Sequence, residues 1–375
     1  MRKMAQRIKE AIKNGEKVVV YGDADLDGAT SVIIVKESIQ SLGGKVVAVY
    51  FPDREKEGYG ITKTGLKYLK DKSPALLVCV DLGIGNFKEV LLAKKMGFEV
   101  LIADHHEILG SLPKASIVVD PKQKGDKYPF KALAAVGVVF KLSELILGDK
   151  LSGNLKKSFL ELAALGTVAD MMPRKEDNRL FVDDGLPALK NSFRPGIKVF
   201  WKKEYFGKGL DLNQKVSKII SLLNIRDVKN RLPASYRLLS TSSLKESEAI
   251  VKRLLSKNDV RKKKIAKILK SAQEKIGERD ERIIFEGGED FEAILISSVA
   301  SILCRDYLKP VFLYKKMAKE SMGTARATQK TNLVSLMKKC SNLLITFGGH
   351  PQAAGFRIEN GKLDKFKECL IKNLE

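Results

Sequence analysis

The sequence predicts an α/β protein in which a parallel-sheet domain and a smaller α/β domain are joined by a long helix. Between residues 17 and 191, short apolar runs alternate with amphipathic runs, a pattern typical of a parallel sheet with helices on both faces. A charged amphipathic run without proline extends from Leu244 to about Arg279 and predicts one connecting helix. Strand and helix patterns then resume. We therefore expect domains at 1–191 and 281–375, a helical region at 192–280, and a cleft between the two domains.

The N-terminal elements follow from residue type and periodicity. Apolar, β-branched runs predict strands at Lys17–Tyr21, Lys45–Phe51, Ala75–Val80, Phe98–Ala103 and Ser116–Val119. Apolar residues three and four apart predict helices at Gly28–Leu42, Thr62–Asp71, Phe87–Met96, Ala132–Leu147, Leu155–Thr167 and part of Asn178–Lys190. The first residues, 1–7, lack the apolar centre of a signal peptide and predict an exposed amphipathic helix.

The rest of the chain, from residue 192 onward, is predicted to contain more helices than strands. Short helical patterns occupy residues 192–240, around Asn213–Leu223. Two alternatives to one long connecting helix are a break near Asn258 and Asp259, and two helices packed in one domain. The C-terminal domain is expected to have strands at Arg282–Phe285, Pro310–Tyr314 and Ser321–Thr328, and helices at Ser298–Arg305, Leu333–Cys340 and Leu363–Asn373.

Composition narrows the class of partner. The 375 residues carry a formal net charge of +23, which favours a polyanion such as nucleic acid; the alternative is a lysine-rich surface with no local purpose. No apolar run is long enough to span a bilayer. Four scattered cysteines without a CxxC pair predict neither a zinc site nor a disulfide framework, and they fit a reducing cytoplasm; they are Cys79, Cys304, Cys340 and Cys369.

An acidic turn follows the first predicted strand. Asp23, Asp25 and Asp27 occupy alternate positions before Gly28, which suits a tight strand-to-helix turn. Three carboxylates this close repel one another, and burying them unpaired is costly. A divalent cation held by carboxylate oxygens would balance their charge. The alternative is a solvated acidic loop at a helix N-terminus.

Two more strands end in residues that bind metals. The third strand ends in Asp81, and the fourth ends in Asp104, His105 and His106. The carboxyl ends of parallel strands share one edge, so we expect these groups to meet the acidic turn. A further candidate is Asp170, which ends a helical run where its charge opposes the helix dipole.

The C-terminal domain offers candidate phosphate contacts. Gly348 and Gly349 precede His350, and glycines that open a helix let backbone N–H groups approach a phosphate. Arg326, on the preceding predicted strand, could make a bidentate phosphate contact. The alternatives are an ordinary turn and a solvated surface arginine.

Taken together, these residues resemble the DHH phosphoesterase superfamily, and specifically its RecJ-like single-strand-specific exonucleases. The name comes from the Asp-His-His triplet, matched here by residues 104–106, and the first motif of the family is matched by Gly22–Gly28. Further similar segments occur in family order at Pro52–Arg54, Gly58–Gly60, Gly137–Lys141, Gly166–Asp170, Asn178–Arg179 and Gly348–Phe356.

The resemblance implies two divalent metal ions, Mn or Mg, in an active site at the cleft. The implied ligands are Asp23, Asp25, Asp27, Asp81, His105 and Asp170, with Asp81 bridging. Asp104 would support His105, and His106 would lie near the scissile phosphate as a proton donor or charge stabiliser. The second domain would hold substrate phosphate through Arg326, Gly348, Gly349 and His350.

The implied activity is metal-dependent exonuclease cleavage of single-stranded DNA, RNA or both. Other candidates are a phosphodiesterase or phosphatase acting on nanoRNA, a nucleotide bisphosphate or a cyclic dinucleotide; an inorganic pyrophosphatase; and a non-catalytic replication-complex scaffold. Glu286–Ser297 lacks the expected His-Pro-Gly turn. The length is nearer that of compact archaeal-type members, some tied to the replication complex GINS, than that of bacterial RecJ with its added OB-fold. The resemblance assigns no polarity, sugar preference or oligomeric state.

Overall fold

The computed structural model describes residues 1–108, 110–277, 281–328 and 330–374, and the side chain of His350 lies outside the description. The chain forms two compact units, Met1–Ser256 and Lys257–Glu375. The division of the chain at residues 191 and 280 stays a prediction.

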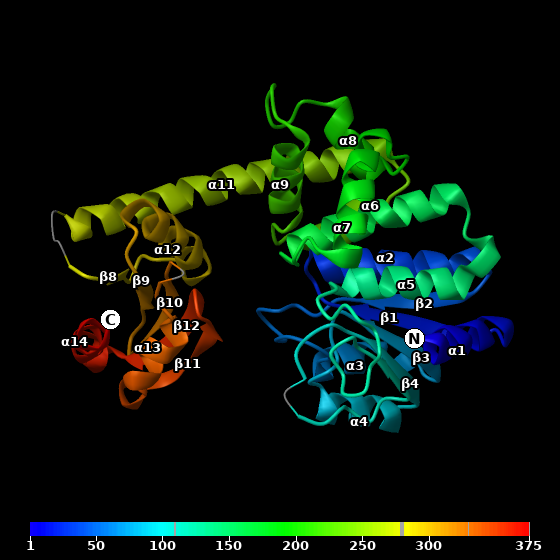
Figure 1. Cartoon of the computed structure of the whole chain (residues 1–375), viewed down its shortest axis with the longest axis horizontal. Helices are drawn as coiled ribbons and strands as arrows, with labels where there is room; N and C mark the ends of the chain where they lie inside the picture. The colour runs from blue at the N-terminus through cyan, green and yellow to red at the C-terminus, as the bar shows by residue number, and fades with distance from the viewer. Residues whose placement is uncertain (109, 278–280, 329, 375) are drawn as a thin grey trace. The chain divides into compact units, whose positions relative to one another are not determined.

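Five parallel strands form the sheet of the first unit, as predicted (Figure 1). Their order is β2-β1-β3-β4-β5, and their bounds are β1 Lys17–Gly22, β2 Lys45–Tyr50, β3 Ala75–Val80, β4 Phe98–Ala103 and β5 Ile117–Val119. All six residues of β3 are buried, because helices cover both faces of the sheet. The shared strand direction places all five carboxyl ends along one edge.

Helices divide the apolar side chains of this sheet between two cores. Val18 and Val20 of β1 face the core shared with α1 (Arg2–Lys13), α2 (Leu26–Ser41), α5 (Ala135–Leu147) and α6 (Gly153–Ala169). Val19 and Tyr21 face the core shared with α3 (Lys63–Leu69) and α4 (Phe87–Lys95). This alternation follows the two-residue period of a strand. The N-terminal helix forms as predicted, but the expectation that it is exposed is wrong, because α1 buries its apolar stripe against the core.

The next part of the chain, residues 176–240, packs onto the core of the first unit. Its first helix was predicted as part of Asn178–Lys190, whereas residues 192–240 showed only short helical patterns. This part of the chain contains α7 (Glu176–Ala188), α8 (Pro195–Lys202), α9 (Leu212–Leu223), the short strands β6 (Val228–Lys229) and β7 (Leu232–Pro233), and α10 (Ala234–Ser240). The sequence predicted α9 but not α8 or α10. Those helices have 8 and 7 residues, too few turns for an apolar period to stand out.

A buried arginine fastens this region to the sheet helices. Arg194, at the start of α8, donates to both oxygens of Glu37 in α2 at 2.8 and 2.5 Å. It also donates to the Ser158 hydroxyl in α6 at 2.5 Å and to the Leu239 carbonyl in α10 at 3.2 Å. Four helices therefore depend on one side chain that is only 7% exposed.

We expect Arg194→Ala to lower the free energy of unfolding by about 2 kcal/mol, because it leaves Glu37 without its cation. The effect stays below that of a fully buried pair because Glu37 is 28% exposed and can be partly hydrated. Urea denaturation measures it. The control is Arg305→Ala, whose exposed side chain pairs only with the adjacent Asp306 among the described residues and should change stability by less than about 0.5 kcal/mol. Equal losses in the two variants would contradict the role given to Arg194.

The long helix α11 (Leu244–Ile276) is continuous through Asn258 and Asp259, which confirms one helix over the two alternatives. The second unit has a mixed sheet in the order β11-β12-β10-β9-β8, in which only β8 and β9 are parallel among the described strands. The bounds are β8 Ile284–Gly288, α12 Ala293–Tyr307, β9 Val311–Lys316, β10 Glu320–Arg326, α13 Leu333–Lys339, β11 Leu344–His350, β12 Ala353–Glu359 and α14 Leu363–Asn373. One core lies between this sheet and α11 with α12, and another between it and α13 with α14 (Figure 1).

Two expectations for the second unit are wrong. Gly348 and Gly349 do not open a helix: they lie in β11, paired with Gly355 and Ala354 of β12. Cys340 and Cys369 form a disulfide that joins the end of α13 to α14, whereas the cysteine spacing predicted no disulfide. The two residues are 29 positions apart, and only the packing of α13 beside α14 brings them together. In the described part of the chain, none of the helices combines the length and the apolarity that a membrane crossing requires.

Candidate metal centre

Backbone contacts within the acidic turn after β1 fix the positions of its aspartates. Asp23 follows the strand, and Asp25 is the N-cap residue of α2, where its side chain accepts from the Gly28 N–H at 3.0 Å. A Cβ on Gly28 would lie 2.3 Å from the carbonyl oxygen of Asp23, so the turn closes only with glycine. Asp27, in the first turn of α2, is 2% exposed. The turn therefore packs three carboxylates against the edge of the sheet.

Asp27 is bound from a distant helix. Its two oxygens accept from the backbone N–H groups of Ala135 and Val136 at 2.8 Å each. These residues open α5, and the positive end of a helix dipole stabilises an anion there. A Cβ on Gly166 of α6 would lie 3.0 Å from the same carboxylate, so α6 also approaches closely.

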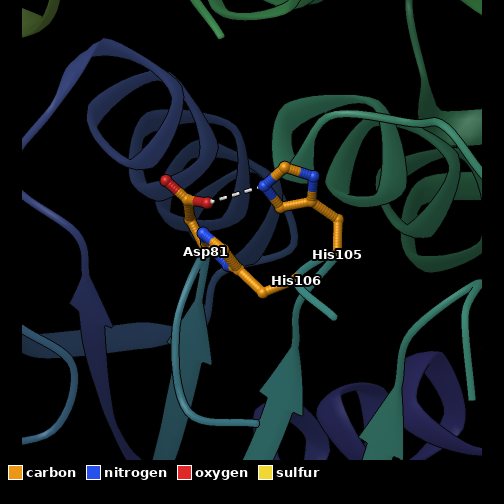
Figure 2. Close-up of side chains that lie close together, drawn as sticks. All are labelled: Asp81, His105 and His106. Atoms are coloured by element: carbon orange, nitrogen blue, oxygen red, sulfur yellow. Dashed lines mark ion pairs between the residues drawn. The ribbon is translucent and has the colours of Figure 1, made fainter. Parts of the chain in front are cut away.

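The imidazole of His105 points at the carboxylates. Its Nδ1 lies 3.0 Å from the Leu133 carbonyl oxygen, which can only accept, so Nδ1 carries the proton and Nε2 presents a lone pair. Nε2 lies 3.3 Å from Asp81, 3.6 Å from Asp170 and 3.9 Å from Asp27. Figure 2 shows the Asp81 contact. A lone pair facing carboxylate oxygens is repulsive unless a cation lies between them.

The six predicted ligands meet in one cluster. Among the described residues, ligand atoms lie within 4.8 Å of one another in three sets: Asp23, Asp25 and Asp81; Asp27, His105 and Asp170; and Asp81, His105 and His106. Asp81 and His105 each belong to two sets, so the sets form one continuous group. Asp81 also has a positive φ of 61°, a conformation that Asp tolerates better than most residues.

The carboxylates of the cluster carry charges that a cation would stabilise. Burial, and then the Asp27 and Asp25 charges, raise the pKa of Asp81 well above its usual value. Burial, and then the charge of Asp170, also raise the pKa of Asp27 well above its usual value. Burial and the Asp25 charge raise the pKa of Asp170 to about 6, and its Oδ2 has no hydrogen-bond partner among the described residues. Mixed carboxylate and imidazole donors suit Mn or Mg, so these residues fit divalent metal ions.

Asp104 and His106 form a hydrogen-bonded pair in which His106 also belongs to the third of these ligand sets. The Asp104 carboxylate accepts from His106 Nδ1 at 2.8 Å and from the backbone N–H groups of Ile84 and His105. Burial raises the Asp104 pKa, but these hydrogen bonds and the His106 charge outweigh it and lower that pKa. The hydrogen bond to Asp104 raises the pKa of His106 to about 9. His106 is thus a cation at neutral pH, and its side chain is 54% exposed.

Arg54 belongs to this site, although the sequence indicated it only as part of a motif. Its guanidinium donates to both oxygens of Asp23 at 2.9 and 2.5 Å and to Asp25 at 2.8 Å. It also lies over the ring of Tyr59 at 5.0 Å. The sequence could have indicated Arg54 by its position, because it is a lone arginine just after the second strand, at the same edge of the sheet as the acidic turn.

A pocket of about 350 Å³ adjoins the carboxylates within the first unit. Its lining includes Asp25, Asp27 and Asp170 of the cluster, and also Asn224, Arg226 and Ser235. Arg226 is held by Asp53 and Glu55 at 2.8 and 2.6 Å. The sequence indicated none of these last three residues, because Asn224 and Arg226 lie between α9 and α10 and Ser235 lies in α10, where the sequence has no clear pattern.

The four predicted phosphate contacts lie in the second unit. Arg326 donates to Ser297 and Ser301 of α12 at 2.5 and 3.2 Å, and burial lowers its pKa. The backbone of Gly348, Gly349 and His350 lies in β11. The side chain of His350 is outside the described residues.

Two family models match this chain. The family model "DHH family, N-terminal domain" matches residues 17–167, and the "DHHA1 domain" model matches residues 280–375. The single-stranded-DNA-specific exonuclease RecJ of Bacillus subtilis is 34% identical over 372 residues, which are 96% of this chain and 46% of that protein. The RecJ of Thermus thermophilus is 28% identical, over 98% of this chain and 53% of that protein.

Solved structures extend the similarity to the fold. An exonuclease RecJ crystallised with bound manganese has a TM-score of 0.77 and 27% identity, covering 99% of this chain and 93% of that one. The RecJ of Thermus thermophilus in complex with Mn²⁺ has a TM-score of 0.79 and 27% identity, covering 99% and 54%. The chain thus spans about half the length of these Bacillus and Thermus relatives. It belongs to the DHH/DHHA1 phosphoesterases, as a RecJ-like member.

Proposed function

We propose that the chain is a metal-dependent exonuclease that hydrolyses phosphodiester bonds of single-stranded DNA, RNA or both. The observation that carries this proposal is the convergence of five carboxylates and His105 Nε2 at one edge of the sheet. The RecJ relatives are named for single-stranded DNA, and the net charge of +23 suits a polyanionic substrate.

Two divalent ions would be held by Asp23, Asp25, Asp27, Asp81, His105 and Asp170. When bound, they supply an activated water and neutralise phosphate charge. Asp81 belongs to two of the ligand sets, which supports a bridging role. The hydrogen bond from His105 Nδ1–H to the Leu133 carbonyl keeps Nε2 unprotonated and directed at the carboxylates of Asp81 and Asp170, where it could bind an ion.

His106 would act on the substrate itself. Asp104 keeps its imidazole protonated and oriented through the 2.8 Å hydrogen bond to Nδ1, which leaves Nε2–H free to donate. That proton would go to a phosphoryl oxygen or to the leaving oxygen, stabilising charge that develops there. In the second unit, Arg326, Gly348, Gly349 and His350 would contact substrate phosphate. A replication-complex partner such as GINS is proposed from resemblance alone.

A second candidate is a phosphodiesterase for short substrates. The pocket of about 350 Å³ beside Asp25 and Asp170 is at the small end of ligand sites. It would suit a mononucleotide or dinucleotide better than a long strand.

Digestion of end-labelled single-stranded DNA and RNA, with a linear and a cyclic dinucleotide in parallel, separates the two candidates. We expect stepwise shortening of the long strands with manganese and none with EDTA; the labelled end also gives the polarity. Cleavage of the dinucleotides alone would select the second candidate. If manganese-binding protein cleaved none of the four, both enzymatic proposals would be wrong and the scaffold alternative would stand.

A further inference from the structure

Asn178 is a buried polar residue that is not one of the six predicted metal ligands. It lies in the first turn of α7 and is 0% exposed. Burying an amide is costly unless it is hydrogen-bonded. Its Nδ2 donates to the Ala132 carbonyl at 2.6 Å and to the Pro173 carbonyl at 3.1 Å. One amide therefore joins two segments that are far apart in the sequence.

The two carbonyl oxygens fix the orientation of this amide. A carbonyl oxygen can only accept, so the NH₂ group of Asn178 rather than its Oδ1 must face both of them. Among the described residues, Oδ1 has no hydrogen-bond partner. The hydrogen bonds that this side chain makes to the described chain are thus its two donations, and they use both N–H groups.

Residues 132–136 hold two of the metal ligands. The Leu133 carbonyl accepts from the Nδ1–H of His105 at 3.0 Å. Two N–H groups at the start of α5 donate to Asp27 at 2.8 Å each. The carbonyl that accepts from the amide belongs to Ala132, which directly precedes Leu133. A shift of the first carbonyl therefore moves the second one, which orients His105.

The other carbonyl belongs to the turn that follows Asp170. Asp170 is the C-cap residue of α6, and Pro173 follows it in this turn. The Pro173 carbonyl also accepts from the Lys175 N–H at 2.8 Å, so the turn is fixed at the start of α7. Nε2 of His105 lies 3.6 Å from Asp170. The amide of Asn178 thus connects the supports of two ligands that face each other.

Other contacts hold the first turn of α7 in place. Asp177 accepts from Nζ of Lys141 in α5 at 2.8 Å and from the Tyr128 hydroxyl. Phe181 is buried in the core of the unit. Because these contacts do not involve Asn178, α7 should stay attached when the amide is removed. The loss should then be confined to the segment and the turn that the amide joins.

We propose that Asn178 is a positioning residue of the metal centre, whose two donated hydrogen bonds fix the Leu133 carbonyl and thereby hold His105 opposite Asp170. It acts through Leu133 rather than on a metal ion. Losing such a supporting partner typically lowers metal affinity about 10- to 100-fold. The effect on metal binding rests on the proposed function, whereas the effect on the ring of His105 does not.

The first measurement identifies the protonated nitrogen of His105 in the metal-free chain. The chain has three histidines, so ¹⁵N labelling of histidine and long-range ¹H–¹⁵N NMR resolve three rings. At pH 8 an ordinary histidine is neutral, while His106, with a pKa of about 9, is still a cation. His350→Gln removes another signal, and the one that remains belongs to His105. We expect the Nδ1–H form in the unaltered chain.

Asn178→Leu should change this tautomer. Leucine has a similar size but donates no hydrogen bond, so the Leu133 carbonyl is no longer fixed. The Asp81 carboxylate lies 3.3 Å from Nε2 of His105 and competes for the proton. The Nε2–H form should therefore appear in the variant. Asn178→Ala removes the amide without adding apolar bulk and should give the same result, so the test does not depend on the folding of one variant.

The second measurement is manganese binding by isothermal titration. Asn178→Leu is expected to weaken it about tenfold or more. The control is Arg194→Ala, which lowers stability elsewhere in the unit, because the side chain of Arg194 donates to Glu37, Ser158 and Leu239. This control should keep the Nδ1–H form of His105 and a manganese Kd within about twofold of the unaltered chain.

An Asn178→Leu chain that kept the Nδ1–H form at His105 would overturn the inference. Unchanged manganese affinity in this variant would also overturn it. If Arg194→Ala produced the Nε2–H form as well, the cause would be a general loosening of the unit and Asn178 would have no positioning role. If the unaltered chain bound no manganese, the proposed function would be wrong, while the tautomer of His105 would still decide whether Asn178 positions that ring.

Discussion

Asp81→Asn is expected to lower turnover about a thousandfold, or about 4 kcal/mol in transition-state stabilisation. Asn keeps the shape of the side chain and tolerates the positive φ of 61° at this position, so the backbone should not move. It removes the charged oxygen that two of the three ligand sets share. The rate of manganese-dependent digestion of a labelled single strand measures the loss.

Stability measurements on Asp81→Asn distinguish a loss of metal binding from a loss of the folded structure. Asp81 is 2% exposed, and repulsion from Asp27 and Asp25 adds to the cost of its charge, so the metal-free variant should be at least as stable as the unaltered chain. Manganese should raise the melting temperature of the unaltered chain, because ligands stabilise the state that binds them, and should raise that of the variant less. Calorimetry with and without manganese measures both.

The control for Asp81→Asn is Asp149→Asn. Asp149 is exposed in the short 3-10 turn after α5 and has no ion pair among the described residues. It should keep full turnover and the full manganese-dependent rise in melting temperature. A turnover of Asp81→Asn equal to that of the control would show that Asp81 is no metal ligand.

Gly28→Ala is expected to lower the free energy of unfolding by about 4 kcal/mol and to abolish manganese binding. The added Cβ would lie 2.3 Å from the carbonyl oxygen of Asp23 and 2.8 Å from its nitrogen. These are backbone atoms, so no side-chain rotation relieves the collision, and the turn itself must open. Opening it separates Asp23 from Asp25. Urea denaturation and isothermal titration with manganese measure the two effects.

Gly153→Ala is the matched control for this backbone effect. Gly153 begins α6, has no positive φ, and a Cβ there would meet nothing within 4 Å. Alanine should therefore stabilise the chain slightly, by up to about 1 kcal/mol, with unchanged manganese binding. If Gly28→Ala also left stability and manganese binding unchanged, the turn would not need a glycine.

The fold was predicted from local patterns of apolar residues, and the structure confirms most of the strands and helices that these patterns predicted. Apolar runs such as Ala75–Val80 were long enough to specify a buried strand, and the long helix had enough turns to show its period. The short helices α8 and α10 were missed for the opposite reason. Gly348 and Gly349 were misplaced because two glycines fit a turn as well as a strand, and only pairing with β12 decides between them.

The sequence by itself determined which groups can meet at the edge of the sheet. Asp23, Asp81 and Asp104 each follow a strand, and parallel strands carry their ends to the same edge. Only the tertiary structure decided how those groups face one another. The Leu133 carbonyl fixes the tautomer of His105, α5 supplies two N–H groups to Asp27, and Arg54 reaches the acidic turn from another loop. These contacts join residues 28 to 109 positions apart, and no local pattern encodes such a distance, because each contact exists only after the helices have packed.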